Sequence, residues 1–283
     1  MHSSQVKMIV LALVVFFSTG SFKGQSSTFT VSSFNLRLDT SNDKQNAWPF
    51  RKEMVKELIS YHNFDIIGTQ EGFLHQIQDV LELEGWAYYG KGRDDGKTQG
   101  EHSAILYKKD KFELLDSGDF WLREEPELPG KGWDATCCNR IASWVKLQDK
   151  VTNQSFFVFN VHFDHEGVIA RKESGKLMVK KMQQIAKNAP VILTGDFNST
   201  PDTEQIRHIS SFLDDSYKVS KTPPYGPVGT FSGFNLNAEL KNRIDYVFVS
   251  SDFKVHSYGA LTDIQQGRFP SDHLPVVVKL TLK

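Results

Sequence analysis

Short apolar runs alternate with polar segments along most of the chain, which is typical of strands joined by loops. Other segments have apolar residues three or four positions apart, as in Val55, Leu58 and Ile59, which share one helical face. The predicted helices cover residues 48–62, 72–84 and 170–188, and a further helix starts at the Thr200-Pro201 pair. The predicted strands cover residues 29–35, 66–69, 86–89, 103–107, 112–120, 141–148, 155–162, 191–195, 229–231, 244–250, 253–261 and 276–280.

The order of these elements predicts the layers of the fold. Between residues 86 and 162 five strands follow one another without helices, so hairpins must join them. A simple doubly wound parallel sheet is therefore excluded. We expect an α/β four-layer sandwich, in which two mixed, mainly antiparallel β-sheets lie face to face with helices on their outer faces. The irregular segments 90–99 and 124–133 are predicted to be loops at the rim of a site.

The first residues have the pattern of a secretory signal peptide. Lys7 precedes an apolar run over residues 8–17, and small residues, including Ser18 and Gly20, follow it. The run is too short to span a bilayer as a helix. We therefore predict a signal peptide over residues 1–24, cleaved at about residues 20–24, and a single domain over residues 25–283. The protein would then be exported, to the periplasm or the outside of the cell. An N-terminal helix or a core strand is the alternative.

The composition is that of an ordinary globular protein. The 283 residues include 33 Lys and Arg against 34 Asp and Glu, with a net charge of −1, and 39% of them are hydrophobic and 24% charged. These values exclude a disordered or collagen-like chain. They also argue against a protein that coats nucleic acid through bulk charge, so any polyanion must be held by a local site.

The two cysteines, Cys137 and Cys138, are adjacent in sequence and are too few for a disulfide framework. We interpret them as small, partly buried apolar side chains, because the geometry of a bond between neighbouring cysteines is restrictive. A vicinal disulfide is the alternative. A zinc site with His162 and His165 is not expected, since adjacent cysteines lack the usual spacing of zinc ligands.

Polar side chains interrupt the predicted strands where these strands end. Acids, amides and histidines lie in the segments 33–37, 69–71, 160–165, 194–198, 243–246 and 271–275. Strand ends display the catalytic groups of many α/β folds. Asp196 and Asn198 are two positions apart, so both would point to the same side of an extended segment. A pocket built from these ends would be rich in oxygen ligands, which suit Mg²⁺ or Mn²⁺.

The same segments read SFNLR, TQE, NVHFDH, TGDFNSTPD, RIDYVFVS and SDHLPV in order, and they run from Ser33 to Pro275. This ordered series resembles the endonuclease/exonuclease/phosphatase superfamily. NVHFDH and WDATCCNR are most similar to its compact secreted bacterial members, which are related to deadenylases. The resemblance implies the two-sheet sandwich as a single catalytic domain. It also implies hydrolysis of a phosphoester by in-line attack of water, with Mg²⁺ or Mn²⁺ as cofactor.

The resemblance further implies a metal site and a group that activates water. Glu71 would be the principal metal ligand, with Asn35 beside it and Asp272 in support. Asp196 would position or deprotonate the attacking water. Asn198 would hold that carboxylate or the oxygens of the phosphate.

Two histidines would act on the phosphate. His273 would contact the scissile phosphate, with Asp245 fixing its tautomer. His162 would stabilise charge on the phosphate oxygens, and Glu101 matches the acid that pairs with this histidine in some members. Arg140 matches a basic residue that contacts the phosphate.

The rim loops bear on the substrate. Trp133 is a candidate to contact the leaving group, because an aromatic ring can stack on a base or a sugar. Charges of both signs on the loops favour a compact phosphoester, either a small-molecule phosphodiester or phosphomonoester or the end of a short oligonucleotide. We expect a monomer with no stable membrane anchor.

Three other functions stay open. An extracellular nuclease acting on DNA or RNA would use the same site. Residues 160–165 nearly spell the H-x-H-x-D-H signature of metallo-β-lactamase-like hydrolases, although Asn160 stands where the first histidine should be. The third alternative is a catalytically inactive binding protein on the same fold.

Overall fold

The computed structural model describes Met1 and residues 26–283 of the chain. Apart from Met1, the predicted signal peptide lies outside these residues, so both the segment and its cleavage site stay predictions. No helix within residues 26–283 is long and apolar enough to cross a membrane.

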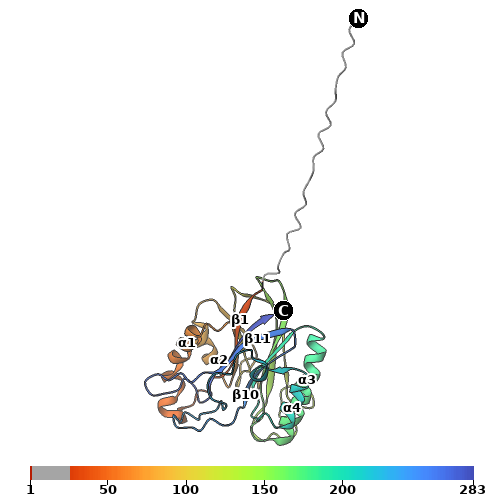
Figure 1. The fold of residues 1–283 in the computed structure, drawn as a ribbon. Helices are drawn as coiled ribbons and strands as arrows, with labels where there is room; N and C mark the ends of the chain where they lie inside the picture. The colour runs from red at the N-terminus through yellow and green to blue at the C-terminus, as the bar shows by residue number, and fades with distance from the viewer. Residues whose placement is uncertain (2–25) are drawn as a thin grey trace.

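Two six-stranded sheets make up the centre of the described part of the chain (Figure 1). The first sheet contains, in spatial order, β11 (Phe253–Ala260), β12 (Val276–Leu282), β1 (Thr28–Asn35), β2 (Ile66–Gln70), β4 (Ile105–Lys108) and β3 (Trp86–Tyr89). The second contains β5 (Phe112–Trp121), β6 (Ile141–Asp149), β7 (Ser155–His162), β8 (Val191–Asp196), β10 (Asp245–Val249) and β9 (Asp214–Asp215).

Each of these sheets has one parallel pair among its described strands. β1 is parallel to β2, and β7 is parallel to β8, whereas the other neighbours are antiparallel. A parallel pair needs a crossover connection, which a helix supplies in both cases. α1 (Lys52–Tyr61) connects β1 to β2, and α3 (Val168–Ala186) connects β7 to β8. The predicted mixed, mainly antiparallel sheets are confirmed.

Helices cover the outer faces of both sheets. In Figure 1, α1 and α2 (Leu74–Leu81) lie on one side of the strands, and α3 and α4 (Glu204–Ser210) lie on the opposite side. One apolar cluster fills the space between the sheets. A second packs the β5–β10 sheet against α3 and α4, and a third packs the other sheet against α1 and α2. Three apolar layers between four layers of structure confirm the predicted four-layer sandwich.

The predicted strand 229–231 is wrong. Phe231 forms only an isolated bridge with His273. The Gly229 N–H donates to the carbonyl of Leu240 in an irregular loop, so this segment does not join the edge of a sheet.

Some helix boundaries also differ from the prediction. The helix expected at Thr200-Pro201 begins at Glu204 instead, and Thr203 occupies its N-cap position. A 3₁₀ turn, η2 (Trp48–Phe50), precedes α1 within the predicted helix 48–62. Three short elements, η1 (Ser41–Asn46), β9 and α5 (Ser216–Val219), are too short to show a hydrophobic period and were not predicted.

A buried polar bridge joins the two sheets where the polar strand ends lie. Asn160 of β7 donates from Nδ2 to the carbonyls of Thr69, at 2.7 Å, and Ala104, at 2.9 Å, in the facing sheet. Gln70 Nε2 donates in return to Asn160 Oδ1 at 2.7 Å. Gly68 permits this close approach, because a Cβ atom there would collide with the side chains of Thr194 and Asn160. The bridge therefore fixes the spacing of the sheets at this end.

Gly68→Ala should destabilise the protein by about 1–3 kcal/mol, because the added methyl group must push the sheets apart or displace Asn160. The measurement is the midpoint of urea unfolding. Gly259→Ala, in strand β11, is the matched control, since its Cβ would meet only ordinary contacts beyond 3.6 Å around Tyr225. Equal midpoints for the two variants would show that the bridge tolerates displacement.

Candidate active site

The register of the strands brings the polar strand ends together. In the second sheet, His162 at the end of β7 and Asp245 at the start of β10 both pair with Asp196 at the end of β8. In the first sheet, Asn35 ends β1 and Glu71 directly follows β2, its parallel neighbour. Because these strand ends lie at the same end of the sandwich, the five side chains converge there.

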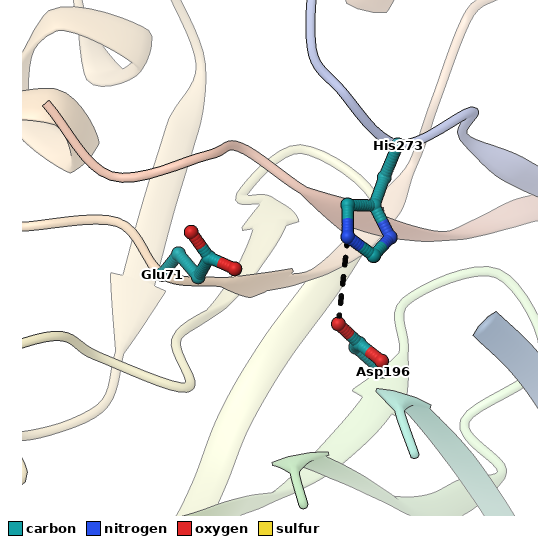
Figure 2. Close-up of side chains that lie close together, drawn as sticks. All are labelled: Glu71, Asp196 and His273. Carbon is teal, nitrogen blue, oxygen red and sulfur yellow. Dashed lines mark ion pairs between the residues drawn. The ribbon is translucent and has the colours of Figure 1, made fainter. Parts of the chain in front are cut away.

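Two of these side chains, together with His273, have the donor set of a metal site. Figure 2 shows Glu71, Asp196 and His273 pointing toward a common space. One ligand atom from each lies within 4.8 Å of the other two, and His273 Nε2 is 3.7 Å from Asp196 Oδ2. Two carboxylates and an imidazole at these distances fit a divalent cation such as Mg²⁺ or Mn²⁺.

Asn35 joins the two carboxylates across the gap between the sheets. Its Nδ2 donates to Glu71 Oε1 at 3.0 Å and to Asp196 Oδ2 at 3.1 Å, while its Oδ1 accepts from the Arg37 N–H. Burial alone would raise the pKa of Glu71, but the charge of His273 and the Asn35 hydrogen bond outweigh it and lower that pKa. Asn35 thus holds the carboxylates in place, and its role as a metal ligand stays a prediction.

Asp272 lies beside Arg37 rather than in this three-residue group. The Arg37 guanidinium is 3.7 Å from Asp272 Oδ2 and 3.8 Å from Glu71 Oε2, and it pairs with Asp43 through two bonds of 2.9 and 3.0 Å. The hydrogen bond to Asp43, and then the charge of Asp272, raise the pKa of Arg37 above its ordinary value. Arg37 is therefore a fixed positive charge beside the carboxylates, and metal support by Asp272 stays a prediction.

His273 and Asp245 form the expected pair. His273 Nδ1 lies 2.9 Å from Asp245 Oδ2, which leaves Nε2 facing Asp196. The backbone N–H of Asp245 donates to Thr230 Oγ1 at 3.1 Å, so the start of β10 is held in place. Burial alone would lower the pKa of His273, but the charges of Asp245 and Asp196 outweigh it and raise that pKa well above its ordinary value. Without a bound cation these charges favour the protonated imidazole, and a cation ligated by Nε2 would have to displace its proton.

Asp196, Asn198 and His162 form a second connected group. Asp196 Oδ1 accepts from the Asn198 N–H at 2.9 Å, and Asn198 Nδ2 lies 3.1 Å from His162 Nε2. Burial, and then the charge of Asp245, raise the pKa of Asp196 to about 7. Burial, and then the charge of Arg140, lower the pKa of His162 well below its ordinary value, so this ring is neutral.

Two arginines lie at the other end of the site. Arg93 Nη1 donates to Glu101 Oε2 at 2.6 Å, whereas His162 Nδ1 is 3.9 Å from the same oxygen. Glu101 therefore pairs more closely with Arg93 than with the histidine that the resemblance implied. Burial raises the pKa of Glu101 to about 7. Arg140 is 5% exposed and lies 3.4 Å from Asp164 through Nε.

These groups line one cavity of about 440 Å³. Its polar lining includes every predicted catalytic and metal-binding residue except Asn35 and Asp245, which lie directly behind it. Its apolar wall includes Leu38, Phe231 and Ile244. The Phe231 ring is 49% exposed and lies 5.0 Å from the His273 ring, centre to centre. An apolar wall beside charged groups suits the organic part of a small ligand.

Two residues or pairs at the rim differ from the expectation. Trp133 is not among the described residues that line the cavity, because its ring packs against the apolar cluster between the second sheet and α3, and its contact with the substrate stays a prediction. Cys137 and Cys138 form a disulfide and line the cavity, instead of packing as separate apolar side chains. They lie outside the apolar clusters, so the alternative of a vicinal disulfide is the one that the structure has.

Three residues of the site have a left-handed backbone. The φ angles of Arg37, Glu71 and Asn198 are 56°, 62° and 45°. Non-glycine residues seldom adopt this region, and those that do gather at functional sites. The loops after β1, β2 and β8 therefore turn sharply, which aims these three side chains into the cavity.

The sequence interpretation missed several cavity residues. Arg37 stood inside a quoted motif but received no role, and Arg93 stood in a loop whose charges were considered to cancel. Phe231 was placed in a strand that does not exist. The missing signal was spatial, since only the fold shows that the loop 90–99 folds back over Glu101 and Arg140.

The comparison with protein families agrees with this geometry. Residues 32–273 match the family model described as the Endonuclease/Exonuclease/phosphatase family. The chain belongs to this family of phosphoester hydrolases, as the motifs predicted, and members of the family depend on divalent metals. Membership in this family excludes the metallo-β-lactamase-like alternative. Asn160, which stands where that alternative needs a histidine, instead joins the two sheets through its amide.

Two solved structures from Bacteroides thetaiotaomicron are similar over nearly the whole chain. One, a protein of the same family, is 44% identical, with a TM-score of 0.88 over 92% of this chain and 99% of that one. The other, a mannosyl-6-phosphatase, is 45% identical, with a TM-score of 0.85 over 89% and 99%. A curated relative, the 3'-5'-exoribonuclease subunit Ccr4 of Candida albicans, is 22% identical; the match covers 83% of this chain but only 38% of that protein.

Asp245→Asn should lower the pKa of His273, because the variant removes the nearest charge that stabilises the imidazolium while burial still disfavours it. The measurement is an NMR titration of the His273 ring in chelator-treated protein. Asp110→Asn, on an exposed turn, is the control and should leave that pKa unchanged. An unaltered titration in Asp245→Asn would assign Asp245 a purely structural role.

Proposed function

We propose that this chain is a divalent-metal-dependent phosphoesterase, acting as a monomer, that hydrolyses a compact phosphoester by in-line attack of water. The observation that carries the proposal is the composition of the cavity. One space of about 440 Å³ joins the Glu71, Asp196 and His273 group to the buried guanidinium of Arg140. A candidate metal site that faces a buried guanidinium suits a phosphate that contacts both.

Arg140, with His162 and Asn198 beside it, binds the phosphate. Arg140 Nη1 is buried and has no hydrogen-bond partner among residues 26–283. An unpaired buried donor is costly, and a phosphate oxygen supplies the acceptor that it lacks. His162 is neutral, so it can contact the phosphate without competing with Arg140 for negative charge.

Asp196 takes the proton of the attacking water. A carboxylate with a pKa of about 7 is suited to act as a base near neutral pH. As the water oxygen bonds to phosphorus, the bond to the leaving oxygen breaks on the opposite side. The protonated His273 balances the negative charge that collects beside Asp196. A divalent cation at the Glu71 group would neutralise charge developing on the phosphate oxygens.

A small phosphate ester fits the chain better than a long nucleic acid. The net charge is −1, and acidic residues offset the basic ones on the rim loops, so phosphates outside the cavity would find few partners. The 45% identical relative that spans the whole fold is a mannosyl-6-phosphatase. The similarity to Ccr4 supports the second candidate function, a nuclease. This support is weaker, because the identity is 22% and the match covers only part of that protein.

The test is hydrolysis of a sugar phosphate, a small phosphodiester, a short single strand and a duplex DNA in Mg²⁺ or Mn²⁺. We expect the highest kcat/KM for a small ester, with a weak dependence on salt. Excess chelator should abolish activity, and Glu71→Gln should lower it by about 100-fold or more at an unchanged melting temperature. Glu113→Gln, on an exposed part of β5, is the matched control.

Each contrary result has its own meaning. A strong preference for long duplex with a steep salt slope would establish the nuclease instead. Full activity in excess chelator, or in the Glu71→Gln variant, would remove the metal from the reaction. Failure to cleave any of the four substrates would favour the inactive binding protein.

The proposed location of this activity is outside the cytoplasm, which the signal-peptide pattern of residues 1–24 supports. N-terminal sequencing of the exported protein should begin between Ser21 and Gln25. An intact Met1 on protein recovered from the cytoplasm would contradict export.

A further inference from the structure

We infer that the closed end of the cavity is a subsite for a terminal phosphoryl group, and that Arg93 is the residue that selects phosphomonoesters over phosphodiesters. The inference rests on the proposed function and specifies its substrate class. It is carried by buried hydrogen-bond donors that have no acceptor and by the small cavity that lies against them.

Two guanidinium groups present unused donors at this end. Arg140 is 5% exposed, and its Nη1 lacks an acceptor within the described chain. The Arg93 side chain is 13% exposed, and its Nε is likewise buried without a partner in residues 26–283. Both residues line the main cavity. Folded proteins seldom leave such donors unpaired, so two of them beside one cavity indicate an anionic ligand.

A second, much smaller cavity lies against the same two arginines. Its volume is about 10 Å³, and besides Arg93 and Arg140 it is lined by Glu71, Glu101, His102, Ser103, Ile141 and His162. Such a volume accommodates about one water-sized atom. On this side the two guanidiniums therefore leave room for a single oxygen atom and for no larger group.

The charges at this end also favour a dianion. Arg93 pairs with Glu101 at 2.6 Å and its Nε lies 4.0 Å from Asp94, a distance too long for a hydrogen bond, while Arg140 lies 3.4 Å from Asp164. Burial, opposed by Glu101, lowers the pKa of Arg93, and the charge of Arg140 lowers it further. The two guanidiniums therefore repel each other, and an anion that lies between them relieves this repulsion.

The three non-bridging oxygens of a phosphomonoester then have three charged partners: a cation held by the Glu71, Asp196 and His273 group, Arg140 and Arg93. A monoester carries nearly two negative charges at neutral pH. A diester has a second oxygen esterified and one charge fewer, so it leaves a buried donor unpaired. Sites built to hydrogen-bond a group discriminate strongly against analogues that lack it.

The role of the Arg93 side chain can be separated from that of its backbone. The Arg93 carbonyl accepts from Trp121 Nε1 at 2.7 Å, and its N–H donates to the Glu101 carbonyl at 3.0 Å. These backbone bonds position the loop 90–99 and survive substitution of the side chain. A change at Arg93 therefore tests the guanidinium itself.

The experiment measures kcat/KM for a phosphomonoester and for its methyl diester, in Mg²⁺, with wild type, Arg93→Met and Arg93→Lys. We expect the wild type to prefer the monoester by 100-fold or more. Arg93→Met should lower kcat/KM for the monoester by about 10- to 100-fold and change the diester much less. Arg93→Lys keeps the charge but loses the planar guanidinium with its several donors, so its kcat/KM for the monoester should lie between those of wild type and Arg93→Met. If the Met variant does not fold, the Lys variant is compared with wild type in its place.

Arg123→Met is the matched control. Arg123 directly precedes the other rim loop and also has a buried Nε without a partner among the described atoms, but it does not line the cavity. The ratio of the two kcat/KM values should not change in this variant. A wild type that cleaves both esters equally, or an Arg93→Met variant that loses both by the same factor, overturns the inference and leaves the proposed function intact. If the wild type cleaves neither ester, the proposed function itself fails.

Discussion

The relation between the two sheets depends on the side-chain amide of Asn160. Backbone hydrogen bonds fix the strands within a sheet, but facing sheets are held by side-chain packing, which resists separation more than sliding. Asn160 donates to Thr69 and Ala104 in the facing sheet. If β7 slid along β2, these buried groups would lose their partners. His162 ends β7 and Glu71 follows β2, so the Asn160 amide also fixes the distance between the strand ends that carry these two side chains.

The same site concentrates negative charge where little water can screen it. Glu71, Asp196, Asp245 and Asp272 all lie close to His273, and Arg37 supplies a second positive charge. Burial, and then the charge of Asp245, raise the pKa of Asp196 to about 7. A divalent cation and a proton therefore compete for the same excess of negative charge. The carboxylates are stable as a group only because several buried cations and amide donors surround them.

The fold and the centre of the site could both be predicted from the sequence, because both depend on the strands. Long β-rich segments show their hydrophobic period, and motif residues such as Glu71 and Asp196 lie at strand ends, where topology alone gathers them. Features that depend on how loops fold could not be predicted. The predicted strand 229–231 was wrong because loop hydrogen bonds, not periodicity, decide its position. Trp133 packs against an apolar cluster, and no pattern in the sequence indicated this contact.

The same distinction explains why Arg93 had no predicted role and why the cysteine pair was misread. The two cysteines lie in an irregular segment at the rim, so no hydrophobic period indicated their position. Arg93 and Arg140 are far apart in the sequence, and only the fold brings both to one cavity. A guanidinium on such a loop reads in sequence as one more surface charge. Its burial is a property of the folded chain alone.

One consequence of the two parallel pairs concerns how such a protein diverges. Glu71, His162 and Asp196 come from the ends of β2, β7 and β8, whose positions follow from sheet register. Arg93 and the Cys137–Cys138 disulfide come from loops outside that register. Mutations can therefore rebuild the loops, and with them the choice of molecule attached to the phosphate, while the hydrolytic centre is inherited unchanged. A single ancestral reaction can in this way supply a lineage with enzymes for many different phosphate esters.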